Sequence, residues 1–266
     1  MSSHSSGILI AVLTFVTLVA LTGYQVTSET SAVRLLGRLG AAMVELDRWL
    51  PAHREDIDLL ARDRADQPIV LAGLPVEVAI PSQVVLEEPE PVLQSTIAEA
   101  MGRRMYEEGY TAVRDDQGET HLGLTEPLRW SIDALDSSAH GFWRIALLVT
   151  GGALAIILLL HVWTRQSPMP GVVAGSGIAA LAGLLAWFGS MLLGGGLDGA
   201  IDEEVGRVAT DGLWIGVRNG VAACAIGLGG LYAYNSLVGE RPPEEEYWDE
   251  YDYETVEVGS QESPPY

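Results

Sequence analysis

The charged residues that stand apart in this sequence are two arginines inside long apolar runs. Arg144 lies near the start of the run 142–163, and Arg218 lies five residues past the start of the run 213–237. A charged side chain at the centre of a bilayer costs about 3 kcal/mol, and such residues are often functional. At the helical rise, Arg218 would be roughly 7–8 Å deep, from where its side chain can reach the interface.

A cluster of acidic residues precedes Arg218 in the sequence. Its members are Asp202, Glu203, Glu204 and Asp211. We expect these carboxylates at the same membrane face as Arg144 and Arg218, where they would form an interfacial charge cluster. Structural pairing or snorkelling is the first interpretation, and a site for an anion or a lipid headgroup is the alternative. The acids do not follow the order of an EF-hand loop, so a calcium site is not predicted.

The histidines give no sign of a metal site. They are scattered, with no pair at a spacing of three or four residues: His4, His53, His121, His140 and His161. Metal ligands usually cluster, because three or four groups must reach one ion. The sequence also lacks the GxSxG, HExxH and Walker patterns. We therefore predict no catalytic residue, no metal and no cofactor, and we do not expect an enzyme.

Small residues recur at a spacing of four in the last two apolar runs. They are Gly171, Gly175 and Ala179 in one, and Gly216 and Gly220 in the other. Such residues let helix backbones approach closely within a membrane, where lipid removes the hydrophobic drive for association. Packing within one chain is the first interpretation, and a homo-oligomer formed through this face is the alternative.

Residues 238–266 form an acidic C-terminal tail with aromatic residues among the acids. The aromatic residues are Tyr247, Trp248, Tyr251 and Tyr253. A segment of this composition cannot bury enough apolar surface to fold, so it is predicted to be disordered. Acidic segments with aromatic anchors also bind basic surfaces of partner proteins. Solvation and binding of a protein partner therefore both remain interpretations of the tail.

Four apolar runs position these residues, and each is long enough to cross a bilayer as a helix. They cover residues 8–24, 142–163, 172–193 and 213–237. Trp143, Trp163 and Trp214 lie at the ends of the runs, where tryptophan favours the headgroup level. After the stub 1–7, the first run is expected to be a retained signal anchor, since the stub has no arginine or lysine and no clean small-x-small cleavage site follows the run. A cleaved signal peptide is the alternative.

Charge distinguishes the two short connections between the later runs. The connection 164–171 carries Arg165 and no acid, whereas 194–212 carries five acids and Arg207. Basic loops favour the cytoplasmic side. We therefore expect a multi-pass protein of the cell membrane with both termini in the cytoplasm, although Arg34 and Arg38, just after the first run, argue against this orientation. The net charge of −21 excludes nucleic acid as a partner.

The block 25–141 is predicted to be a small extracytoplasmic α+β domain inserted between the first two membrane helices. Apolar residues spaced by three and four predict a helix over Thr30–Leu50, interrupted at Pro51, and a second helix through Arg64. Glu90–Glu108 has the same spacing and is followed by Gly109, a residue suited to ending a helix.

The middle of this block alternates apolar and other residues. Val76–Ile80 predicts a strand with one buried face, and residues 69–71 and 84–86 are candidates to pair with it. Residues 115–118 predict a turn. A helix over 128–139 is expected to lead into the second crossing, with a bend at Gly141.

The predicted architecture is thus a bundle of four membrane helices with one small inserted domain and a disordered acidic tail. This layout favours a non-catalytic scaffold, assembly or sensing component that contacts membrane lipids. The alternative is a channel or transporter subunit built on the glycine-rich third and fourth helices.

Overall fold

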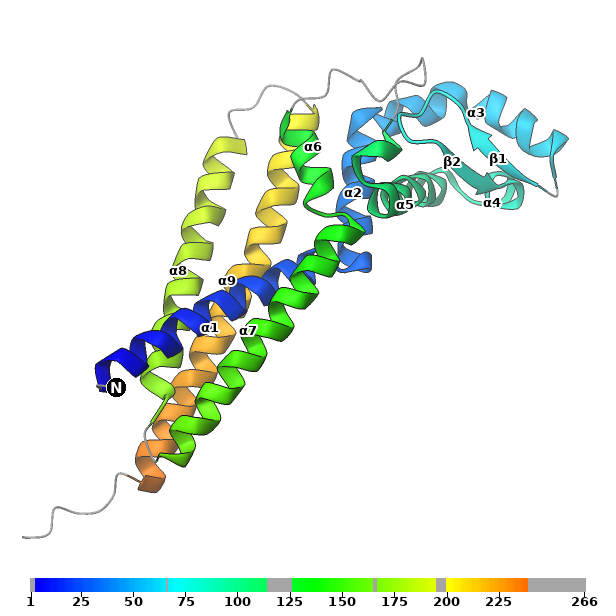
Figure 1. The fold of residues 1–266 in the computed structure, drawn as a ribbon. Helices are drawn as coiled ribbons and strands as arrows, with labels where there is room; N and C mark the ends of the chain where they lie inside the picture. The colour runs from blue at the N-terminus through cyan, green and yellow to red at the C-terminus, as the bar shows by residue number, and fades with distance from the viewer. Residues whose placement is uncertain (1–2, 66, 114–125, 165–166, 195–199, 239–266) are drawn as a thin grey trace, which may run out of the picture.

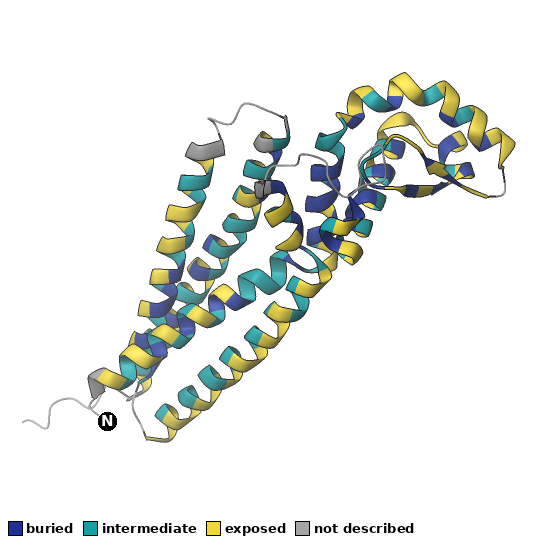
Figure 2. Cartoon of the chain, turned by 45° about the horizontal axis from the view of Figure 1, so that its top comes forward, coloured by how far each residue is buried: buried dark blue, intermediate teal, exposed yellow. Residues whose placement is uncertain are grey.

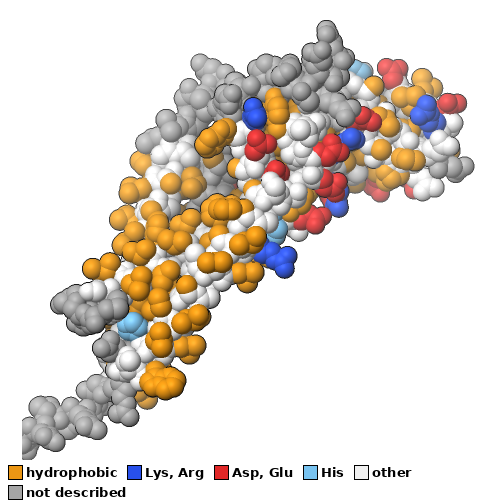
Figure 3. Space-filling model, in the orientation of Figure 1, with side chains coloured by type: hydrophobic (Ala, Val, Ile, Leu, Met, Phe, Trp, Pro, Cys, Tyr) orange, Lys and Arg blue, Asp and Glu red, His pale blue; other side chains and the backbone are white. Residues whose placement is uncertain are grey.

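Four helices in this computed structural model are long and apolar enough to cross a membrane, which indicates membrane residence. The structure describes residues 3–65, 67–113, 126–164, 167–194 and 200–238. The four helices are α1 (Ser3–Val26), α7 (Ser137–Trp163), α8 (Met169–Gly194) and α9 (Ala200–Val238) (Figure 1). All 27 residues of α7 are described and none of them is buried. Apolar side chains cover the same part of the molecule (Figure 3), as a helix bundle in lipid requires.

The region between α1 and α7, residues 27–136, is called the head below. It holds α2 (Glu29–Met43), α3 (Leu46–Asp63), α4 (Ser82–Glu87), α5 (Glu90–Glu108), the 3₁₀ turn η1 (Gly109–Ala112) and α6 (Glu126–Asp133). It also holds one sheet of two strands, β1 (Pro68–Leu71) and β2 (Val78–Pro81). The head lies at one end of the membrane helices, beside the first turns of α9 (Figure 1).

The first two helices of the head meet at a different place from the one predicted. The helix expected over Thr30–Leu50 ends at Met43, and α3 begins at Leu46 and runs through Pro51. The chain turns at Glu45, which has a φ of +47°. This turn directs Leu46 and Leu50 into the core, where both are buried. Burial of these leucines, rather than the proline, sets the position of the break.

The predicted strand pairs with only one of its two candidate partners. β1 and β2 are antiparallel, with Ile69 opposite Ile80 and Leu71 opposite Val78. All four side chains are buried on one face of the sheet. The other candidate, 84–86, is wrong as a strand because these residues lie in α4. A short apolar run is compatible with either element, and its burial against α3 selects the helix.

Helix α5 has the predicted bounds, and Gly109 follows it with a φ of +64°. It crosses α2 at very close range. A Cβ on Gly102 of α5 would lie 2.6 Å from the backbone nitrogen of Gly37 in α2. Buried residues from both helices, the sheet and α6 form the core of the head. The cartoon in Figure 2 colours buried residues dark blue, and they gather where these elements meet. Its largest fully buried members in this region include Leu36, Leu39, Leu50, Ile69, Ile80, Leu93, Ile97, Met101, Met105, Leu128 and Ile132.

The bend expected at Gly141 is wrong, because Gly141 lies inside α7. The chain breaks instead between α6 and α7, at residues 134–136. Asp136 starts α7, since its Oδ1 accepts a hydrogen bond of 2.7 Å from the backbone N–H of Ala139. A side-chain acceptor at this position satisfies one of the free N–H groups of the first turn. The turn predicted at 115–118 lies outside the described residues.

Helix α9 begins within the connection 194–212 that the sequence predicts between the third and fourth crossings. Residues 200–212 are the first turns of α9, which is continuous over 39 residues. Val208 is buried in the core of the head, and Ile201 and Val205 pack against that core. The apolar stripe therefore faces the core of the head rather than the surface of a membrane.

Candidate functional site

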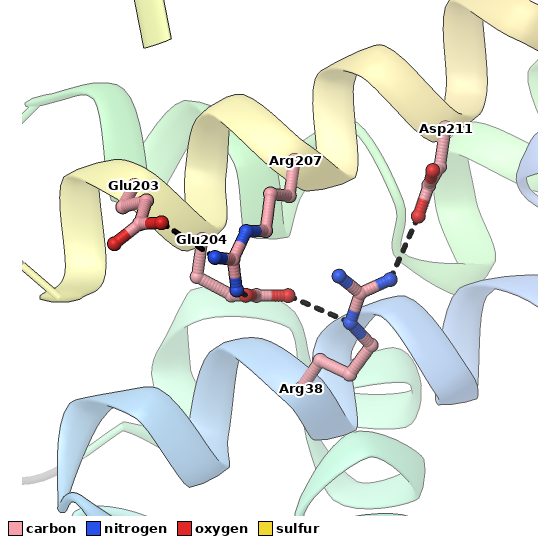
Figure 4. A network of polar contacts seen from close by, with 5 residues as sticks. All are labelled: Arg38, Glu203, Glu204, Arg207 and Asp211. Atoms are coloured by element: carbon pink, nitrogen blue, oxygen red, sulfur yellow. Dashed lines mark hydrogen bonds and ion pairs between the residues drawn. The ribbon is translucent and has the colours of Figure 1, made fainter. Parts of the chain in front are cut away.

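The first turns of α9 are joined to α2 by a cluster of charged side chains (Figure 4). Arg38 of α2 lies between two acids of α9: its Nε is 2.7 Å from Glu204 Oε1, and its Nη1 donates a hydrogen bond of 2.7 Å to Asp211 Oδ2. Glu204 and Asp211 are seven residues apart, about two helical turns, so they share one face of α9. One guanidinium therefore bridges two turns of the neighbouring helix.

Arg207 completes this cluster, which we call the α2–α9 clasp: Arg38, Glu203, Glu204, Arg207 and Asp211. Arg207 pairs with Glu203 and lies 3.5 Å from Glu204 Oε2. The side chain of Glu204 is only 11% exposed. A carboxylate so far removed from water is costly unless it is paired, and Glu204 lies between two guanidinium groups.

The Arg38–Glu204 contact is an ion pair without the alignment of a hydrogen bond at Oε1. Partial burial lowers the pKa of Arg38, but the hydrogen bond to Asp211 and the charges of both acids outweigh this effect and raise the pKa above its ordinary value. Arg38 therefore remains a cation at any physiological pH and attracts both acids.

Both arginines predicted for the interfacial charge cluster lie outside the clasp. In the part of the chain that the structure describes, neither Arg144 nor Arg218 has an ion-pair partner, and both are exposed. The acids Glu203, Glu204 and Asp211 pair with Arg38 and Arg207 instead. The reason is that the first turns of α9 pack against α2, which brings these acids beside Arg38. Asp202 lies in α9, but its side chain is outside the description.

Arg38 itself was not singled out by sequence reasoning. It lies on an amphipathic helix that also carries Arg34, and only the approach of α9 distinguishes the two. That approach depends on contacts between residues far apart in the sequence, and Arg38 and Asp211 are separated by 173 positions. No local pattern encodes it.

Just inside the clasp, α1 is tied to its neighbours by polar contacts. Asn219 of α9 donates hydrogen bonds to Thr22 Oγ1 at 3.1 Å and to Gln25 Oε1 at 2.8 Å. On the other side, Thr27 Oγ1 lies 3.2 Å from His140 Nδ1 of α7, and the ring of His140 stacks on Tyr24. The end of α1 is thereby fixed to both α9 and α7.

The predicted small residues pack inside one chain. The site of a Cβ on Gly171 is 2.8 Å from Ile10 Cβ of α1, and that on Gly220 is 2.6 Å from the backbone nitrogen of Ala180 in α8. Gly175 likewise meets α1, at Ala11 and Thr14, and Gly216 meets Thr22, while Ala179 is buried. These contacts agree with packing within the bundle. A homo-oligomer stays a prediction.

An apolar cavity of about 590 Å³ opens beside these contacts, between α1, α6, α7, α8 and α9. Small residues form much of its wall, among them Ala182, Gly183 and Ala186 of α8. On the described lining, the polar side chains are those of Thr22, Thr27, Ser131 and Trp143, and none is charged. The cavity therefore suits an apolar occupant rather than an ion.

A metal ion would need several ligating side chains close together. Among the described residues, no group of three or more His, Cys, Asp or Glu side chains is placed to hold a metal ion. The aromatic residues of the predicted tail site, Tyr247, Trp248, Tyr251 and Tyr253, lie outside the described residues. Comparison with protein-family models, curated proteins and solved structures finds no match to this chain. The function of this chain is therefore inferred from its own structure.

Proposed function

We propose that this protein is a non-catalytic membrane component, a scaffold, assembly or sensing subunit, whose head engages a partner and whose α9 conveys the position of the head across the membrane. The observation that carries the proposal is the union of two features in α9. It is one continuous helix of 39 residues, and its first turns are clasped to α2 through Arg38.

The length of α9 supports this role. At a rise of about 1.5 Å per residue, a helix of 39 residues is about 58 Å long, whereas the hydrocarbon core of a bilayer is about 30 Å thick. Nearly half of the helix thus extends beyond the hydrocarbon. Its start is packed against the head, and its end leads into the acidic tail. A movement of the head that keeps the clasp intact must move α9 as well.

We further propose that the head is a small α+β domain inserted between the first two crossings. Its buried core supports this proposal, since residues from α2, α3, α5, α6 and both strands form most of it, together with Val208 of α9. We place it outside the cytoplasm, with both termini in the cytoplasm of a multi-pass protein of the cell membrane. The acidic first turns of α9 accompany the head, in keeping with a side that lacks the positive-inside signal.

Purification from native membranes in mild detergent, followed by identification of co-purifying proteins, tests the proposal. Three chains are compared with the wild type. They are a deletion of residues 240–266, Arg38→Glu, which places a new carboxylate beside Glu204 and Asp211, and Arg48→Glu as a control on the exposed surface of the head. We expect the deletion and Arg38→Glu each to reduce recovery of a partner, and Arg48→Glu to leave it unchanged. Identical sets of co-purifying proteins for all four chains would refute the proposal.

The alternative function is a channel or transporter subunit built on α8 and α9. Such a path needs polar groups along its wall, and the apolar lining of the cavity between these helices and α1 disfavours it. Reconstitution into sealed vesicles tests this alternative, because passage of an ion or solute that depends on this protein would support it.

A further inference from the structure

The cavity between the membrane helices has a fixed shape, because its floor is two tightly packed helices. A Cβ on Gly183 of α8 would lie 3.2 Å from the backbone nitrogen of Val217 in α9, so α8 and α9 are in close contact there. Above this floor, Ala182 and Ala186 of α8 and Ala209 of α9 present only methyl groups to the cavity. In the described lining from these two helices, the larger side chains are those of Val208 and Leu213 of α9, and the rest are alanines and glycines.

Helix α1 closes one end of the cavity. It touches α8 near Gly171 and Gly175 and then moves away from it, so that Phe15 and Leu18 form the wall below. The two helices separate past this point, and α1 continues toward α7, where Gly23 meets Trp143. The divergence of α1 from α8 leaves the side of the cavity open.

Helix α6 closes the other end. Ala134 and Leu135 line the cavity at the place where the chain passes from α6 into α7. The space is therefore bounded by α8 and α9, by α1 along its length, and by α6 and the start of α7 next to the head. A molecule inside it would contact five helices, unlike lipid that lies loosely around a helix bundle.

We propose that this cavity holds one acyl chain of a membrane phospholipid as a structural ligand. Its position decides the occupant: four of the five helices that line it, α1, α7, α8 and α9, are long and apolar enough to cross the membrane, where the surrounding solvent is lipid hydrocarbon. Head residues such as Ser131 and Leu135 line the cavity where these helices meet the head. Its volume of about 590 Å³ is within the range of ligand pockets, and its described lining has no charged side chain. An empty space of this size would deprive the small residues of contacts on one side. The inference is independent of the function proposed above.

A substitution that fills the cavity has a matched control on the same helix. Ala182 lines the cavity, whereas Ala174 is an exposed alanine of α8 that does not. Protein reconstituted into phosphatidylglycerol bilayer discs is released into mild detergent and weighed by native mass spectrometry. We expect one retained phosphatidylglycerol per chain in the wild type and in Ala174→Phe, and at least a tenfold lower retained fraction in Ala182→Phe.

A second measurement keeps the test informative if Ala182→Phe fails to fold. Trp143 lines the cavity, so phosphatidylglycerol brominated on its acyl chain should quench its fluorescence strongly. The quenching due to Trp143 is the difference between the wild type and Trp143→Phe. A lipid bound in the cavity should make this quenching saturate at a low fraction of brominated lipid. Bulk lipid that only collides with Trp143 would give quenching that rises steadily with that fraction. Retention of lipid by Ala182→Phe at the wild-type level, absence of retained lipid in the wild type, or a cross-link from a cysteine at position 182 to a second protein chain would overturn the proposal.

Discussion

Replacement of Arg38 by alanine should free the first turns of α9 from α2. The variant removes the cation that bridges Glu204 and Asp211, each at 2.7 Å. Glu204 would keep only its longer contact to Arg207, at 3.5 Å. The local stability of residues 203–211 of α9 is the quantity that should fall.

The size of the effect follows from how far each pair is exposed. The side chains of Arg38 and Asp211 are 39% and 55% exposed, so their pair contributes at most about 1 kcal/mol. Glu204 is 11% exposed, and loss of a partner from a fully buried pair costs about 3–5 kcal/mol. Since Arg38 is partly solvated and Arg207 remains, we expect a total of about 2 kcal/mol, between these limits.

Hydrogen exchange measured by mass spectrometry on the protein in bilayer discs reports this local stability. A loss of about 2 kcal/mol corresponds to roughly 30-fold faster exchange for peptides that cover the clasp. Arg48→Ala is the control: Arg48 is 78% exposed and pairs with Glu45 only three residues away, so its loss should change exchange by less than about twofold. Unchanged exchange in Arg38→Ala, or equal acceleration in the control, would refute the role assigned to the clasp.

Three further changes test the packing and electrostatics of the head. Gly102→Ala should destabilise it by about 1–3 kcal/mol, because the new methyl group would meet the backbone of α2 at Gly37; denaturant unfolding measures the loss. Asp136→Ala should cost about 1 kcal/mol by removing the cap of α7, seen as faster exchange in its first turn only. Burial, then the charges of Glu29 and Asp136, raise the pKa of Tyr106 above its ordinary 10.0, so the folded state disfavours tyrosinate. The contribution of Tyr106 to the free energy of unfolding is therefore fully present below pH 10 and is lost as the pH rises further. In melting curves at alkaline pH, Tyr106→Phe should lose less stability than the wild type. An equal loss in the variant would contradict this prediction.

The membrane helices could be predicted from the sequence because their signal is long and local. Each apolar run is complete within about 20 residues, and lipid places the same demand on every one of them. Helix α5 was equally accessible, since Gly109 marks its end as clearly as the apolar spacing marks its face. In these segments the local pattern and the tertiary environment agree.

The start of α9 could not be predicted because its apolar stripe has two physical solutions. Ile201, Val205 and Val208 would suit the surface of a membrane as well as the core of a protein. The decision depends on where α2 and α6 lie, and that position is fixed by contacts distant in sequence. The same dependence concealed Arg38, whose partners are known only once α9 is seen to extend into the head.

The most direct test of the account is the distance between the head and the far end of α9. Spin labels at cysteines replacing Arg62 of α3 and Ser236 of α9, in a Cys224→Ala background, report this distance by pulsed electron resonance in bilayer discs. We predict one narrow distance distribution in the wild type, broadened by Arg38→Glu and unchanged by Arg48→Glu. A broad distribution in the wild type, or one that Arg38→Glu leaves unchanged, would show that the head moves independently of α9 and would contradict the proposed coupling.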